Sequence, residues 1–111
     1  MRNLIHKNLM TGGWQKLTLM EQLGNIGSEV SRAAYWQGKD EKIFQGAVAR
    51  GLELFDLTLE DSRWVGRLRE IARAREVFCD AVYGGKEYRS SLRELADKYF
   101  LPFAYAARNV K

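Results

Sequence analysis

The chain has 111 residues, 46% hydrophobic and 29% charged, a length that suits one small domain with one core. Its single cysteine, Cys79, excludes an internal disulfide, and a single histidine excludes a Cys/His zinc site. No stretch approaches the roughly 20 apolar residues that span a bilayer. We therefore expect a soluble cytoplasmic protein that makes no membrane contact.

The N-terminal segment has too few apolar residues for a signal-peptide core. Met10 is a candidate start as well as Met1. We expect residues 1–111 to form one helical-bundle domain, in which residues 1–13 are a weakly ordered extension.

The formal net charge of +4 is unevenly distributed. Residues 1–62 carry 7 basic against 8 acidic side chains, whereas residues 63–111 carry 11 against 6. This asymmetry is compatible with a nucleic acid or another anionic partner, although a pI near 9.4 is also common in proteins that bind neither.

Four helix start signals divide the chain. Capping-box patterns begin at Thr18 and at Ser91, each with a glutamate three residues later, and further caps stand at Asp40 and at Asp61 or Ser62. The four helices are expected to run from the first cap to about residue 37, from 41 to near 60, from 63 or 64 to the Gly84-Gly85 stop, and from 92 onward.

Apolar residues at spacings of three and four give each helix one buried face. The first face comprises Leu19, Leu23, Ile26, Val30 and Ala33; the second Ile43, Phe44, Ala47, Val48, Leu52, Phe55 and Leu59; the third Val65, Leu68, Ile71, Ala72, Phe78, Cys79 and Val82; the fourth Leu92, Leu95, Ala96, Tyr99, Phe100 and Phe103.

Short connectors between helices of this length predict an all-α, antiparallel, up-down-up-down four-helix bundle. Pro102 should kink or split the fourth helix, because its ring removes a donor and collides with the carbonyl four residues earlier. Gly24 and Gly27 lie inside the first helix, where their use is the close approach of another helix or of a ligand.

No catalytic motif is present. His6 has no partner near it in sequence, and Arg2 to His6 is too short for the Arg/His spacing of RNA-cleaving helical bundles. We expect a protein that is not an enzyme, with no catalytic residue, cofactor or metal site.

Arg75 falls on the apolar face of the third helix, where an unpaired guanidinium would be costly to bury. The predicted partner is Glu29, in a buried ion pair. Two alternatives remain: the side chain extends along the core and places its head in water, or it holds an anionic ligand.

Antiparallel topology brings the segment before the first helix, the connection between the second and third, and the C-terminus to one end. The candidate nucleic-acid-binding residues of this end are Trp14, Lys16, Arg63, Trp64, Arg67 and Arg108. The alternative is that the tryptophans cover the core and that glutamates of the third helix neutralise the arginines. The opposite end gathers an aromatic rim suited to a protein partner or a second copy, comprising Tyr35, Trp36, Tyr83 and Tyr88.

The stretches WQKLTLMEQLGNIGSEVSRA, LELFDLTLED, RLREIARAREVFCD and YFLPFAYAARN resemble small, uncharacterised bacterial proteins over about residues 10–109. That resemblance implies an all-helical protein and transfers no functional residue. We interpret the chain as a non-enzymatic, self-associating interaction module with RNA or another nucleic acid as a candidate partner. One alternative is a protein-binding accessory or antitoxin-like component without nucleic-acid contact; another is an enzyme or ligand-binding bundle that uses the Arg75 region.

Overall fold

The computed structural model describes residues 13–109 and the side chains of residues 13–107. Residues 1–12 lie outside the described part, and with them His6 and the candidate starts Met1 and Met10. The side chain of Arg108 also lies outside it. All regular elements of the described part are helical: η3 (Trp14–Lys16), α1 (Leu19–Trp36), α2 (Glu41–Leu59), η4 (Ser62–Arg67), α3 (Leu68–Val82), α4 (Leu92–Glu94), η5 (Leu95–Phe100) and α5 (Leu101–Asn109).

The predicted caps begin the helical segments. The backbone N–H of Glu21 donates to Thr18 Oγ1 at 3.1 Å, while the Thr18 N–H donates to the Glu21 carboxylate at 2.9 Å. Ser91 forms the same reciprocal box with its glutamate. Asp40 and Asp61 also accept backbone N–H groups. These bonds satisfy donors that the first turn of a helix leaves free.

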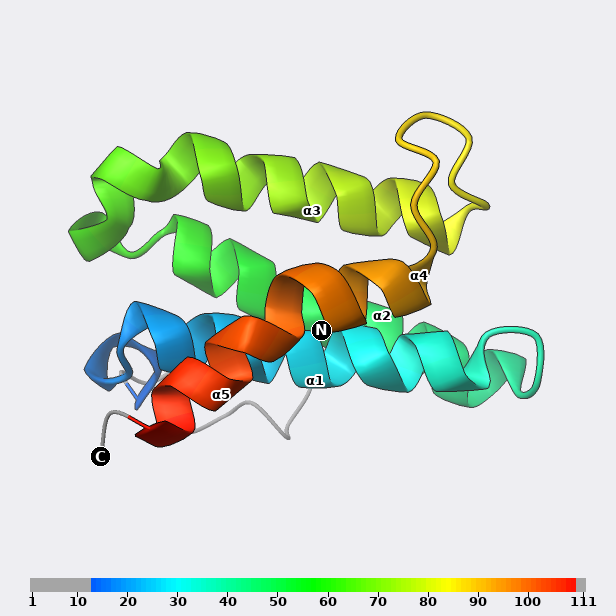
Figure 1. The fold of residues 1–111 in the computed structure, drawn as a ribbon, viewed down its shortest axis with the longest axis horizontal. Helices are drawn as coiled ribbons and strands as arrows, with labels where there is room; N and C mark the ends of the chain where they lie inside the picture. Colours follow the sequence, from blue (N-terminus) through cyan, green and yellow to red (C-terminus); the bar gives the residue numbers. More distant parts are fainter. Residues whose placement is uncertain (1–12, 110–111) are drawn as a thin grey trace.

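Four packed helical segments make up the described chain, which confirms the predicted all-helical bundle (Figure 1). The chain turns back at each of the three connections between them (Figure 1). Helix α1 contacts α2 on one side and α4, η5 and α5 on another, whereas α3 packs mainly on α2. Helix α1 is therefore the central element and α3 lies at the outside.

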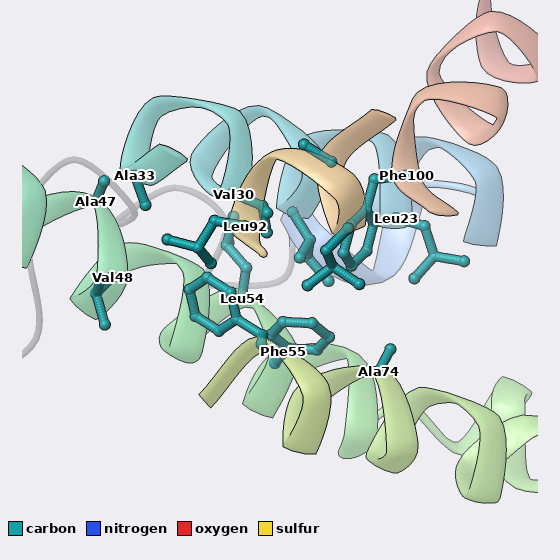
Figure 2. Packing of buried hydrophobic residues seen from close by; sticks show 14 of the residues in the cluster. Leu23, Val30, Ala33, Ala47, Val48, Leu54, Phe55, Ala74, Leu92 and Phe100 are labelled. Carbon is teal, nitrogen blue, oxygen red and sulfur yellow. The ribbon is translucent and has the colours of Figure 1, made fainter. Parts of the chain in front are cut away.

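Phe55 of α2 is at the middle of the core. Its ring centroid lies 5.7 Å from that of Phe78 in α3 and 5.9 Å from that of Phe100 in η5, and all three rings are buried. Figure 2 shows apolar side chains of α1, α2 and the α4–η5 segment, among them Leu23 and Leu92, around this centre. One contiguous core thus joins all four segments.

The fourth segment is divided as predicted, but its irregular part precedes the proline. Residues Leu95–Phe100 form a π-helical turn between α4 and α5, and Pro102 is the second residue of α5. A regular α-helix would set the proline ring against the carbonyl of Lys98, and the wider π turn is the kind of irregularity that relieves this collision.

Both helical glycines of α1 serve helix packing. A Cβ at Gly27 would lie 2.5 Å from Phe100 Cβ, and one at Gly24 would lie 3.3 Å from Ala104 Cα. The segment from η5 to α5 therefore crosses α1 at backbone distance, which confirms the close approach expected from these residues.

Two residues predicted to be buried are exposed. Val65 is 72% exposed, because residues 62–67 form the 3-10 helix η4, whose turn differs from that of the α-helix assumed for them. Ile43 is 38% exposed in the first turn of α2. Among residues 13–109, no helix is both long and apolar enough to cross a membrane.

Candidate functional sites at the two ends of the bundle

Trp14 is fully buried at one end of the bundle. Its indole N–H donates to Thr58 Oγ1 of α2 at 3.0 Å, and the Thr58 hydroxyl donates to the Leu54 carbonyl at 3.0 Å. A tryptophan with no exposed face cannot stack on a base. The predicted stacking role of Trp14 is therefore corrected: the side chain covers the core.

Gln22 of α1 joins Trp14 to the connection between α2 and α3. Its amide N–H groups donate to the Trp14 carbonyl at 2.8 Å and to Asp61 Oδ2 at 3.1 Å, while its carbonyl accepts the Trp64 indole N–H at 2.8 Å. Gln22 is fully buried, and both ends of its amide have partners. We call Trp14, Gln22, Thr58, Asp61 and Trp64 the glutamine network.

The Asp61 carboxylate is almost fully buried and is paired with Arg63. Arg63 Nη2 lies 2.7 Å from Asp61 Oδ2 and also donates to the Leu17 carbonyl at 2.8 Å. Hydrogen bonds from the Arg63 side chain are the main cause that lowers the pKa of Asp61 to about 2, against the opposing effect of burial. The Arg63 guanidinium lies 4.4 Å above the Trp64 ring, so it occupies one face of that indole.

Arg67 is paired with Glu70 at 2.9 Å, and Tyr99 of η5 donates to the same carboxylate at 3.1 Å. The Arg67 hydrogen bond lowers the pKa of Glu70, and burial raises the pKa of Tyr99. Lys16 is exposed. The structure thus brings Trp14, Arg63 and Trp64 together as predicted. The indoles of Trp14 and Trp64 bond within the glutamine network, and carboxylates pair with the partly exposed Arg63 and Arg67.

The predicted ion pair between Glu29 and Arg75 is wrong. Arg75 pairs with Asp56 of α2, Nε to Oδ1 at 3.0 Å, and its side chain is 35% exposed. Glu29 pairs instead with Arg50 at 3.3 Å and with Arg32 at 3.8 Å. The physical reason is that α2 lies between α1 and this flank of α3, so the guanidinium reaches water past α2.

The opposite end presents tyrosines to solvent. We define the aromatic rim by Tyr35, Trp36, Tyr83 and Tyr88, of which the tyrosines are 54%, 83% and 39% exposed and the tryptophan is half-buried. The Gln37 amide lies 3.5 Å from the carbonyls of Ala81 and Val82, which brings the end of α1 beside the end of α3. The predicted gathering of these rings is therefore present.

Internal hydrogen bonds shape the loop that carries the rim. Asp80 accepts the backbone N–H groups of Glu87 and Tyr88 at 3.0 Å each, and the Tyr88 hydroxyl donates to Glu76 at 2.9 Å. Gly85 has φ +72°, and a Cβ there would lie 2.6 Å from the Ser90 carbonyl oxygen. The loop thus has a defined conformation rather than a free one.

Cations surround the rim. Lys39 Nζ lies 3.8 Å from the centroid of the Tyr35 ring. Lys42, Lys86 and Arg89 are exposed, and none of them forms an ion pair with another described residue. At this end the described part of the chain therefore places exposed rings beside cations that form no ion pair.

Sequence reasoning did not identify the glutamine network. Gln22 stands three residues after Leu19 and four before Ile26, so it lies within the apolar stripe of α1. A polar side chain at such a position predicts a buried hydrogen-bond partner. That signal was available, although it does not say which neighbouring helix supplies the partner.

Comparison of the chain with protein families, with curated proteins and with solved structures finds no match in any of the three. The resemblance to small bacterial proteins stays a prediction. Among the described residues, no group of three or more His, Cys, Asp or Glu side chains is placed to hold a metal ion.

Proposed function

We propose that this protein is a cytoplasmic, non-enzymatic interaction module that binds another protein through the aromatic rim. The observation that carries the proposal is the convergence of three exposed tyrosines on one end of the bundle, where Tyr83 is 83% exposed. Tyrosine supplies a large contact area with little loss of conformational entropy and is enriched in protein interfaces.

The charge around the rim supports an acidic partner. Lys42, Lys86 and Arg89 have no ion-pair partner among the described residues. Of the carboxylates in this loop region, Asp80 and Glu76 are engaged by the loop itself, and Glu87 is exposed. Complementary charge steers the encounter and suppresses partners of like charge. The partner chemistry that fits is a protein segment with carboxylates beside apolar or aromatic anchors.

Site-specific photo-crosslinking in cells tests this proposal. We expect p-benzoylphenylalanine in place of Tyr83 to give adducts with a discrete protein. The same group in place of Val65, which is 72% exposed in η4, is the matched control and should not give those adducts. Lys86→Glu with Arg89→Glu should reduce the adducts at position 83. Equal adducts at both positions, or adducts unaffected by the charge reversal, would contradict the proposal.

A second candidate is the binding of single-stranded RNA or DNA at the Trp14 end. The observation that favours it is the exposure of Arg63 and Arg67, whose side chains are 40% and 43% exposed. It ranks below the rim because Asp61 and Glu70 already pair with these arginines. Arg108 is a further candidate contact whose side chain is outside the described part.

Fluorescence anisotropy with a short single-stranded RNA separates the two candidates. Phosphate contacts predict binding that weakens steeply as salt is raised and that is reduced in the Arg63→Ala/Arg67→Ala variant. Trp64→Ala should remove a stacking contribution of about 1–3 kcal/mol if this indole receives a base. No binding by the parent at low salt, or equal binding by all three proteins, would eliminate this candidate.

A further inference from the structure

Helix α3 carries two stripes of side chains at helical spacing, one buried in the core and one half-buried, and Val82 of the second stripe packs partly against the core. The first, Ile71, Ala74, Phe78 and Ala81, is buried in the core. The second runs at spacings of four, three, four and three and is half-buried; it comprises Leu68, Ala72, Arg75, Cys79 and Val82. Alternating steps of three and four are the spacing by which two helices of different chains pack along a seam.

Residues of helix α2 lie beside the second stripe of α3, where Asp56 pairs with Arg75. Leu52 and Leu59 are half-buried and pack partly against the core, and Ala49 is exposed. A shallow hollow of about 370 Å³ lies along α2 and is lined by Ala49, Leu52, Glu53 and Asp56. Helix α3 lies on the outer side of the bundle, away from α1 (Figure 1). We call the second stripe of α3, together with Ala49, Leu52, Asp56 and Leu59, the α2–α3 face.

One ion pair crosses the α2–α3 face. Arg75 and Asp56 are 3.0 Å apart, and their side chains are 35% and 53% exposed, so both charges are accessible. The Arg75 Nη1 atom lies 3.9 Å from Cys79 Sγ, which places the pair beside the cysteine. This pair contributes one charge of each sign to the face, within a protein whose net charge is +4.

We propose that the α2–α3 face binds a second copy of the chain in a two-fold symmetric homodimer. In a two-fold symmetric interface the same surface of both copies is in contact. If one residue contacts a different residue of the other copy, symmetry repeats that contact a second time in the interface. A face that carries both Arg75 and Asp56 is self-complementary, because the guanidinium of each copy can meet the carboxylate of the other. The half-buried Leu, Ala and Val side chains would form the apolar part of the contact.

This dimer is independent of the proposed function, since the rim and the α2–α3 face are different surfaces. The rim carries cations that form no ion pair, whereas the ion pair of the α2–α3 face adds no net charge. Self-association is therefore assigned to this face and protein binding to the rim.

Sedimentation velocity across a dilution series, combined with cross-linking at Cys79, tests the proposal. Because Cys79 is the only cysteine, a short bismaleimide can join two chains only through it. We expect a reversible dimer and a cross-linked species of twice the monomer mass. A monomer at every concentration would overturn the proposal, and so would a dimer that the reagent does not join.

Two matched variants locate the interface. Ala72→Glu sets an unpaired carboxylate into the stripe and should weaken dimerisation at least about tenfold. Arg69→Glu, on the exposed side of the same helix, should leave dimerisation close to that of the parent. Circular dichroism verifies that both variants are folded. A dimer that withstands Ala72→Glu, or one that Tyr83→Ser disrupts instead, would overturn the assignment to this face.

Charge reversal at Asp56 and Arg75 tests the role of the ion pair without adding a charge at an apolar position. Asp56→Arg alone and Arg75→Asp alone should each weaken the dimer, because like charges then face each other across the two-fold axis. The double variant restores opposite charges and should recover dimerisation. Failure of the double variant to recover, in a protein that is still folded, would overturn the role of the ion pair.

Discussion

At the residue scale, Gln22 shows why a polar side chain is kept in this core. Its amide bonds the Trp14 carbonyl, Asp61 and the Trp64 indole, so it ties the segment before α1 to the connection after α2. An apolar side chain of the same size would leave the Trp64 indole N–H without this partner and would remove one of the hydrogen bonds that the Trp14 carbonyl and Asp61 accept. Each buried polar group left unpaired costs about 1–3 kcal/mol.

Acid sensitivity follows from Asp61. Its pKa of about 2 lies below the ordinary value of 3.8, so the folded state favours the charged form. The resulting stabilisation is present above pH 4 and is lost as the pH falls from about 4 to 2; the shift corresponds to at most about 2–3 kcal/mol. We expect Asp61→Asn, which preserves a cap, to lower stability at neutral pH and to flatten the acid limb of the stability curve.

Urea unfolding at a series of pH values measures this effect. Asp97→Asn is the control, because that carboxylate is 53% exposed and pairs with Arg93 on the surface. Its acid limb should match that of the parent. An Asp61→Asn protein with the same pH dependence as the parent would show that Asp61 does not carry this stabilisation.

At the element scale, Gly27 sets how closely α1 and η5 approach. Alanine there places a Cβ 2.5 Å from the Cβ of buried Phe100, so one helix must move. Overpacking typically costs about 1–3 kcal/mol, which exceeds the gain of about 1 kcal/mol in helix propensity. We expect Gly27→Ala to destabilise the fold, as measured by the free energy of unfolding in urea.

Gly46→Ala is the matched control for that substitution. Gly46 lies in α2, and its Cβ would meet only the end of the Arg50 side chain, at 3.4 Å. The helix-propensity gain should then dominate, with a stabilisation of up to about 1 kcal/mol. Destabilisation of both variants by the same amount would mean that the contact with Phe100 is not what Gly27 provides.

Element boundaries were predictable because capping is local. Thr18 with Glu21, and Ser91 with Glu94, fix their helix starts within four consecutive residues, and both boxes form. The partner of Arg75 was not predictable in this way. A helical wheel gives the direction of a side chain on its own helix, but it does not say that α2 rather than α1 flanks α3 there.

The candidate sites show the same division between local and tertiary information. Topology placed Trp14 near Arg63 correctly, but the burial of Trp14 depends on its bond to Thr58, which is 44 residues away. The end of α3 at Tyr83 follows from two glycines with positive φ directly after it. The first requires the packed structure, whereas the second could be anticipated from the sequence.

At the scale of the whole molecule, the helices differ in how many other elements pack against them. Helix α1 contacts α2, α4, η5 and α5, so it loses its protection only when most of the fold opens. Helix α3 packs mainly on α2 and has a half-buried flank. Regions with few buried contacts open first, at a lower free energy than global unfolding.

Native-state hydrogen exchange should resolve this difference. In dilute solution we expect the slowest amides in the middle of α1, around Ile26 and Val30, and faster exchange in α3. Raising the protein concentration should then slow exchange in α3 and α2 selectively, because a second copy on the α2–α3 face must leave before α3 can open. Exchange in α3 as slow as in α1 in dilute solution would mean that the bundle opens as one cooperative unit. Slowing confined to the rim would place self-association there instead.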